Sequence, residues 1–429
     1  MTEITPPRWV LGGGRIHEQY FAEDYLKERN LLSYEGVFFN KEGRVRDESV
    51  LRKDIYDKIC GYVSTSLSKK VSSLLEVIRM EAQVWQFPVR EDVIHVANGT
   101  YDLLEGFSPR KEVCRYRLPA RFDDSLPEPA QWLSFLDQLL EPEDIDTLQE
   151  YMGYCLIPVT YGQKMLTLVG NGGEGKSRIG VVMRAILGDN MSTGSLNKVE
   201  MNNFARADLE HLLLFVDDDL KMEALSQTNY LKAIITADVP MDLERKGKQS
   251  YQGQLYVRFL AFGNSCLQSL HDRSHGFFRR QIILKTKPLD PNRINDHTLG
   301  QKLIRERDAI FLWALTGLYR LIGNNYQFTI SPQAAANLTQ AMEQGNSIRP
   351  FLESEGYIRF DPYGSASSRA LYACYREWAE DNACTPLAQR SFWTHLSENA
   401  QRLGLTYSNN IDIGCGKTAR GFRGIRLCR

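Results

Sequence analysis

Residues 170–177 have the residue types and the spacing needed to hold a triphosphate. They read GNGGEGKS, which matches the pattern G-x-x-x-x-G-K-[ST] between an apolar run and a helical segment. Glycines let the backbone curl until its N–H groups converge on phosphate oxygens, and the following helix adds its positive end. The predicted ATP site consists of Gly170, Asn171, Gly172, Gly173, Glu174, Gly175, Lys176 and Ser177. A glycine-rich turn that binds nothing is the alternative.

Within this segment, Lys176 and Ser177 have separate expected roles. Lys176 would reach the β- and γ-phosphates, and Ser177 would place its hydroxyl on Mg²⁺. Hydrolysis also needs one carboxylate beside the metal and another group to align water. The run HLLLFVDDD supplies acids at the end of an apolar strand, and we assign Asp217 to Mg²⁺ and Asp218 to the water. This assignment can shift by one residue, and a solvated strand end is the alternative.

An amide and two arginines complete the predicted site. The apolar run YVRFLAF leads to Asn264, whose side chain would hydrogen-bond the γ-phosphate or the attacking water. Arg279 and Arg280 precede the run QIIL, where an arginine of one subunit can enter the ATP site of its neighbour. There it would stabilise charge that develops on the transferred phosphoryl group. A surface pair bound to local acids is equally compatible with this pattern.

The order of apolar runs predicts the elements that position these groups. From residue 151 to residue 330, the runs MLTLV, LLLFV, YVRFLAF and QIIL alternate with helical segments, as in a parallel sheet with crossover helices. Residues 1–150 predict a mainly helical N-terminal domain, with a strand turn at Asn98-Gly99 and an acidic, proline-bearing boundary segment at 121–150. Residues 331–429 predict a helical linker and a small terminal domain.

Composition limits the class of protein. A net charge of −1 across 429 residues means that any nucleic-acid surface is a local patch. No apolar run approaches the roughly 18 residues of a membrane span, and the N-terminus lacks a signal-peptide layout. The eight cysteines show no CxxC spacing, which argues against a zinc ribbon and a disulfide framework. We expect a reduced, cytoplasmic protein without membrane partners.

The segments GNGGEGKS, LLLFVDDD, YLKAIITAD, ERKGKQ, FLAFGN and HGFFRR occur in an order that resembles superfamily III helicases of the phage/plasmid primase-helicase family. The resemblance implies an α/β P-loop, AAA+-like ATPase core, ring-shaped hexamers with ATP sites at subunit junctions, and 3′-to-5′ movement on single-stranded DNA. The N-terminal region is similar to the domain that precedes the motor in poxvirus primase-helicases. Family members usually carry Glu at the position of Asp218.

Many relatives carry a primase domain as well. About 150 residues precede the motor here, and they show neither a D-x-D pair on a strand nor a zinc-binding cluster. We therefore expect a helicase without primase activity, which would depend on a separately encoded primase or a host polymerase.

The resemblance also implies DNA contacts. A basic hairpin would grip DNA in the pore through Arg245, Lys246 and Lys248, with Lys232 before it, because lysines on a glycine-containing turn can track phosphates. A solvated charge run is the alternative. The tail is similar to a winged-helix DNA-binding domain, with residues 389–402 as recognition helix. Its expected DNA contacts are Arg390, Lys417, Arg420 and Arg423. A protein-docking tail is the alternative.

These features together predict an ATP-dependent DNA helicase that unwinds the replication origin of a phage, plasmid or other mobile element. The expected partners are single- and double-stranded DNA and further copies of the chain. A second hypothesis is an origin-binding initiator or loader that uses ATP to assemble but does not translocate. A third is a regulatory P-loop switch without a DNA role.

Overall fold

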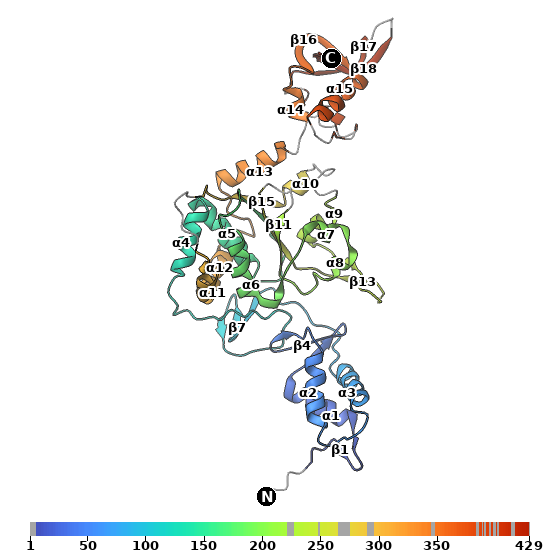
Figure 1. Cartoon of the computed structure of the whole chain (residues 1–429), viewed down its shortest axis with the longest axis vertical. Helices are drawn as coiled ribbons and strands as arrows, with labels where there is room; N and C mark the ends of the chain where they lie inside the picture. The colour runs from blue at the N-terminus through green and yellow to red at the C-terminus, as the bar shows by residue number, and fades with distance from the viewer. Residues whose placement is uncertain are drawn as a thin grey trace.

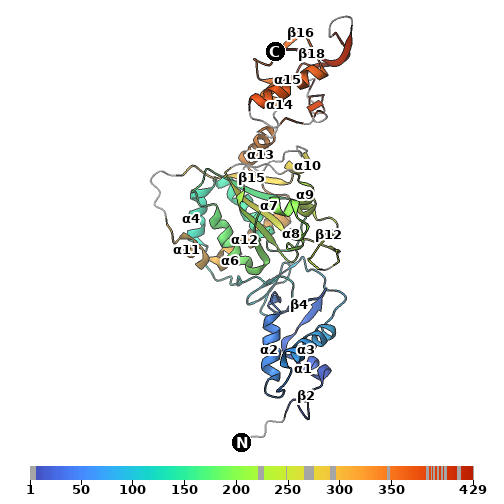
Figure 2. The same cartoon turned by 45° about the vertical axis from the view of Figure 1, so that its right-hand side comes forward.

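The chain forms three bodies in a row, an N-terminal body (residues 6–87), a central body (88–344) and a C-terminal body (348–428) (Figures 1 and 2). The computed structural model describes residues 6–220, 227–247, 249–264, 275–289, 296–344, 348–382, 386–387, 389, 392–393, 396–397, 400, 403–412 and 417–428. Within these ranges no helix is long and apolar enough to cross a membrane.

A five-stranded parallel sheet lies at the centre of the molecule, in the order β10-β11-β14-β9-β15. The strands are β9 (Met165–Val169), β10 (Met191–Thr193), β11 (Leu214–Leu220), β14 (Arg258–Gly263) and β15 (Gln281–Lys285). The four predicted apolar runs and the parallel sheet are confirmed. The short edge strand β10 was not predicted, because its three residues carry no apolar run.

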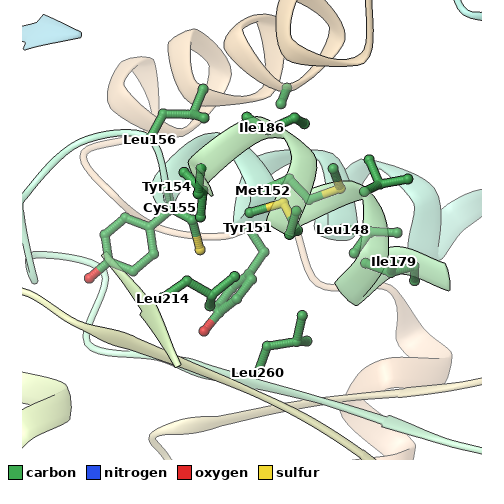
Figure 3. Packing of buried hydrophobic residues seen from close by; sticks show 14 of the residues in the cluster. Leu148, Tyr151, Met152, Tyr154, Cys155, Leu156, Ile179, Ile186, Leu214 and Leu260 are labelled. Atoms are coloured by element: carbon green, nitrogen blue, oxygen red, sulfur yellow. The ribbon is translucent and has the colours of Figure 1, made fainter. Parts of the chain in front are cut away.

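Helices connect and cover these strands. The segments between consecutive strands contain α6 (Ser177–Leu187), η1 (Gly188–Asn190), α7 (Leu196–Met201), α8 (Asn203–Ala207), α9 (Asn229–Thr236) and α10 (His275–Phe278). Further helices are α4 (Ala130–Leu139), α5 (Pro142–Tyr154), α11 (Leu299–Arg305), α12 (Arg307–Gly323) and α13 (Pro332–Gln344). Tyr151 and Met152 of α5 and Ile179 of α6 pack over the sheet residues Leu214 and Leu260 (Figure 3).

Two glycines let α5 and α12 approach closely. A Cβ on Gly153 would lie 2.4 Å from the Ala314 carbonyl oxygen, and a Cβ on Gly317 would lie 2.4 Å from that of Gln149. Any larger side chain would therefore force the two helices apart, because real Cβ atoms do not come this close to backbone. This contact joins the segment before the sheet to the segment after it.

The sequence predicts a domain boundary at residue 150, but the hydrophobic core of the central body extends across that position. The core cluster of the central body runs from Ile94 to Ala334 and includes the fully buried Trp132. Acidic residues and prolines in 121–150 suggested a boundary segment, but its apolar side chains bury against the central body. The N-terminal body has a separate core, which spans Trp9 to Ala82.

The N-terminal body is a small helical unit with short strands. Its elements are β1 (Val10–Leu11), β2 (Arg15–Ile16), α1 (Glu18–Arg29), β3 (Leu32–Tyr34), β4 (Val37–Asn40), β5 (Gly43–Arg44), α2 (Ser49–Ile59) and α3 (Leu67–Glu81). The strands β6 (Val93–Val96), β7 (Gly99–Asp102) and β8 (Gly106–Ser108) follow as an antiparallel sheet. The turn between β6 and β7 contains Asn98, as the sequence predicts.

Two further antiparallel units carry predicted DNA contacts. A hairpin, β12 (Met241–Leu243) and β13 (Tyr251–Gly253), projects between β11 and β14 in chain order. The C-terminal body contains α14 (Ile348–Leu352), β16 (Ile358–Ser367), α15 (Ser368–Asp381), β17 (Thr406–Asp412) and β18 (Thr418–Leu427). Its three strands pair in the order β16-β18-β17, and α15 follows β16 directly.

Candidate functional site

The glycine loop (residues 170–176) joins β9 to α6 at the carboxyl edge of the sheet. Gly172, Gly173 and Gly175 have φ values of 104°, 84° and 103°, a region that side-chain-bearing residues rarely adopt. Gly170 is required for another reason, because a Cβ there would lie 2.1 Å from the hydroxyl oxygen of Thr286. Helix α6 starts at Ser177, so the loop lies over its N-terminus.

The glycine loop binds the carboxylate of one of its own residues, Glu174. The Gly172 N–H donates to both carboxylate oxygens of Glu174, at 2.9 and 3.0 Å, and Lys176 Nζ donates to Oε2 at 2.9 Å. The Lys176 and Glu174 side chains are only 9% and 6% exposed. Burial alone would raise the pKa of Glu174, but hydrogen bonds from Lys176 and the loop backbone lower it on balance. The loop therefore presents donors that converge on an ionised oxygen pair.

A cavity of about 570 Å³ opens beside the glycine loop. Its wall combines the loop and the start of α6 with the ends of two neighbouring strands. It is lined by Gly172, Gly173, Glu174, Gly175, Lys176, Ser177, Arg178, Asp218, Asp219, Leu220, Phe262, Gly263 and Asn264. Thus the structure brings together most of the predicted ATP site with one predicted acid and Asn264. The Asn264 Oδ1 atom lies 4.0 Å from the position of a Cβ on Gly172.

The three aspartates at the end of β11 face different surroundings. Asp218 and Asp219 are exposed and line the cavity, whereas Asp217 is 6% exposed and does not. Asp217 Oδ2 accepts the N–H of Leu196 at 2.8 Å, at the first residue of α7. Burial raises the pKa of Asp217, and the backbone hydrogen bonds oppose this rise.

Asp217, to which the sequence assigns Mg²⁺, therefore lies beside the cavity without lining it. Successive side chains of a strand point to opposite faces, and the pairing of β11 with β14 shifts between Asp217 and Leu220. The sequence does not reveal which acids this irregularity turns toward the cavity. The acids that face it lie one residue further along the chain, at Asp218 and Asp219.

The arginine pair lies at the opposite edge of the sheet from the glycine loop. Gln281 of β15 pairs with Met165 and Lys285 pairs with Val169, so Arg279 and Arg280 come before the strand and the loop comes after it. Five strand residues separate the two ends by about 17 Å. Neither arginine lines the cavity. Arg280 donates to the Gly276 carbonyl, and the Arg279 carbonyl accepts from Lys164. If either arginine takes part in hydrolysis, it must therefore act in the ATP site of another subunit.

Sequence reasoning missed two residues near the cavity. Thr286 follows β15, its N–H donates to the Val169 carbonyl at 2.9 Å, and its hydroxyl covers Gly170. Arg178 lines the cavity from the first turn of α6. The position of Thr286 just after a predicted parallel strand could have identified it, since such strand ends meet at one edge.

The predicted basic hairpin is present, but its cations differ in their surroundings. Lys246 is exposed on the turn beside Gly247, whose φ is 71°. Arg245 instead forms an ion pair with Glu210, and its guanidinium lies 5.5 Å from the Tyr251 ring centre. Lys232 is half-buried on α9, and Lys248 lies outside the described residues. Arg245 is thus engaged within the protein, and Lys246 is the exposed cation of the turn that the structure describes.

Basic residues also lie along β18 of the C-terminal body and just before it. Lys417, Arg420 and Arg423 are exposed, whereas Arg426 is paired with Asp361 at 3.1 Å. Arg390 lies outside the described residues. The predicted DNA contacts Lys417, Arg420 and Arg423, which we call the wing cations, therefore lie on and just before one strand of a small antiparallel sheet.

Comparisons with known proteins give a family match and a structural likeness. The family model that matches residues 168–280 describes a family of unknown function, DUF5906. No curated protein sequence matches the chain. The chain is similar to the A form apo structure of the NrS-1 C-terminal region (305–718), at 10% identity, a TM-score of 0.54, and coverage of 95% of this chain and 99% of that one.

A second apo structure of the same NrS-1 region gives a similar result. The identity is 11%, the TM-score is 0.52, and the match covers 94% of this chain and 98% of the other. A likeness at this identity shows a shared fold across nearly the whole chain. The family match begins at the end of β9 and covers the glycine loop and the strands β11 and β14, up to Arg280.

Proposed function

We propose that this protein is an ATP-dependent DNA helicase of the superfamily III, phage/plasmid primase-helicase type, and that it acts at the replication origin of a mobile element. One observation carries the proposal. A glycine-rich backbone and the Lys176 ammonium hold a carboxylate beside a cavity that Ser177, Asp218, Asp219 and Asn264 line. These donors and acids match the needs of phosphoryl transfer from a nucleoside triphosphate.

The residues of the cavity divide the chemistry among them. Lys176 and the loop N–H groups would hold the phosphate oxygens that Glu174 now mimics, so this carboxylate must move aside when ATP binds. Ser177 and Asp218 would supply oxygen ligands to Mg²⁺, which neutralises charge on the phosphates. Asp219 and Asn264 would orient the attacking water. We propose these roles in place of the pair Asp217 and Asp218.

The arginine pair supports a site shared between subunits. Arg279 and Arg280 lie at the edge of the sheet opposite the glycine loop of their own chain. In a ring, that edge of one subunit could face the cavity of the next, where an arginine would stabilise charge on the phosphoryl group. We therefore propose a ring-shaped homo-oligomer, a hexamer by resemblance to the family.

The exposed turn of the β12–β13 hairpin is the proposed DNA contact of the motor. We expect Lys246→Ala to reduce ATP-dependent unwinding of a forked duplex by about tenfold while basal ATP hydrolysis stays near the wild-type rate, because a phosphate contact couples movement to DNA without touching nucleotide. Unwinding of forks of both polarities, with hydrolysis measured in parallel, tests this. Lys198→Ala, an exposed lysine of α7, is the matched control. Undiminished unwinding by Lys246→Ala would exclude this contact.

The exposed wing arginines support an origin-binding initiator as a second candidate function. We expect Arg420→Ala with Arg423→Ala to weaken duplex DNA binding by about tenfold and to lower its salt dependence, since each phosphate contact adds to the salt slope. The control is Arg376→Ala, an exposed arginine of α15 near Glu380. Fluorescence anisotropy at several salt concentrations measures both quantities, and an unchanged slope would contradict the assignment. A protein that binds duplex and hydrolyses ATP but unwinds no fork is an initiator.

A further inference from the structure

Two cavities are each lined by residues of both the N-terminal and the central body. Figure 1 shows the junction of these two bodies, close to the labels β4 and β7. The volumes of the two cavities are about 380 and 420 Å³, and His211 lines both. Neither cavity shares a lining residue with the cavity beside the glycine loop. We name them the arginine cavity and the aromatic cavity after the residues that line them.

The arginine cavity contains guanidinium groups without carboxylate partners. Arg117 is 8% exposed, and its two Nη atoms donate to the backbone carbonyls of Val96, Gly99 and Glu112 at 2.6 to 2.9 Å. Its Nε atom is buried and has no hydrogen-bond partner. Arg44 is half-buried, and within the described ranges no carboxylate pairs with it or with Arg117.

The acids of the same cavity are paired elsewhere. Glu42 binds Lys111 at 2.8 Å, and Asp189 lies 3.3 Å from Arg46 at the exposed rim. The electrostatic balance therefore leaves two sheltered positive charges beside an open space. Burying such charges is unfavourable unless an anion compensates them. The cavity thus fits a phosphate group, which the Arg44 guanidinium can bind through paired hydrogen bonds while Arg117, whose Nη atoms donate to backbone carbonyls, contributes its charge.

The aromatic cavity adds one fully exposed ring, that of Trp85, and three half-buried rings. Trp85 is 91% exposed, whereas the other tryptophans of the chain are buried or half-buried. Tyr34, Phe87 and Tyr256 also line the cavity, and the Arg115 guanidinium lies 4.8 Å from the Tyr34 ring centre. Aromatic faces beside a guanidinium are what sequence-tolerant stacking of nucleobases requires.

The aromatic cavity is continuous with the proposed DNA hairpin. Gln252 and Gln254 line it, and Gln252 belongs to the hairpin strand β13, whose other end leads to the turn with Lys246. A strand of nucleic acid on the hairpin would therefore reach the rings along one surface.

We propose that the junction of the N-terminal and central bodies binds single-stranded DNA, with a base stacked on Trp85 and a backbone phosphate held by Arg44 and Arg117. The inference rests on the proposed function only in taking DNA as the ligand. It gives the N-terminal body a task, which is to hold the single strand on one side of the motor.

Tryptophan fluorescence of the full chain tests this proposal, with a thymidine oligonucleotide as the probe and no ATP present. We expect the oligonucleotide to quench the emission. Trp85→Phe should bind a labelled oligonucleotide with near wild-type affinity but lose most of the quenching. Trp85→Ala should bind about tenfold more weakly, as expected for the loss of one stacking ring. Leu104→Ala, at a residue that is also 91% exposed, is the matched control.

Arg44→Gln extends the test to the phosphate contact, with Arg110→Gln, whose side chain is 82% exposed, as its control. We expect oligonucleotide binding to weaken in Arg44→Gln and to stay unchanged in Arg110→Gln. Wild-type affinity in Trp85→Ala would overturn the proposal. Equal quenching by thymidine monophosphate or inorganic phosphate would overturn it too, in favour of a mononucleotide site. ATP hydrolysis without DNA, measured in the same variants, keeps the two proposals separate. If the protein hydrolyses ATP but its DNA binding does not depend on Trp85, only the proposed DNA site at the junction is wrong.

Discussion

Lys176→Ala is expected to lower ATP hydrolysis by at least about 100-fold, the scale of effect seen when a group that stabilises developing charge is removed. Lys176 Nζ lies inside the glycine loop, 2.9 Å from the one carboxylate that the loop holds. Among the residues that the structure describes, no other lysine lines the cavity. Steady-state phosphate release, together with nucleotide binding by a fluorescent ATP analogue, measures the effect. Hydrolysis at the wild-type rate would remove the motor from consideration.

The change also leaves a buried carboxylate without its ammonium partner. Glu174 would keep the Gly172 N–H but lose Lys176, which could distort the loop and lower hydrolysis indirectly. The double variant Lys176→Ala with Glu174→Gln removes both charges and separates the two causes. We expect it to melt near the wild-type temperature and still to hydrolyse no ATP. Recovery of hydrolysis in the double variant would show that Lys176 only neutralises Glu174.

Asp218→Asn is the second change with a large expected effect, a fall in ATP hydrolysis of about 100-fold or more. Asp218 is exposed in the cavity beside Ser177, so its loss would weaken Mg²⁺ binding. Raised magnesium should restore part of the rate, because a weaker site fills at higher concentration. Titration of hydrolysis against magnesium measures this. A rate that falls without any magnesium dependence would point to a role with water instead.

Asp217 provides a matched comparison one residue away. Its carboxylate accepts the Leu196 N–H, a bond that an amide oxygen can keep. We therefore expect Asp217→Asn to retain hydrolysis, and Asp217→Ala to lower the free energy of unfolding by about 1 kcal/mol through the lost helix contact. Loss of hydrolysis in Asp217→Asn, with full activity in Asp218→Asn, would restore the assignment made from sequence.

Local patterns in the chain were sufficient for much of this picture. The strand Met165–Val169, the glycine run after it and the start of α6 follow from apolar periodicity and from backbone needs that only glycine meets. The strand that ends beside Asn264 was found in the same way, whereas the hairpin around Gly247 was implied by the family resemblance. These features depend on neighbouring residues, so a sequence alone determines them.

Tertiary packing decided which side chains meet. Asp217 is buried while Asp218 and Asp219 both face the cavity, where the pairing of β11 with β14 shifts, and Glu210 pairs with Arg245 across 35 residues of chain. The acidic segment before residue 150 joins the central core because α5 and α12 pack through glycines. Trp85 shows no periodic pattern, and only the meeting of two bodies places it beside Arg115. Such contacts join residues far apart in sequence, so their partners appear only once the chain has folded.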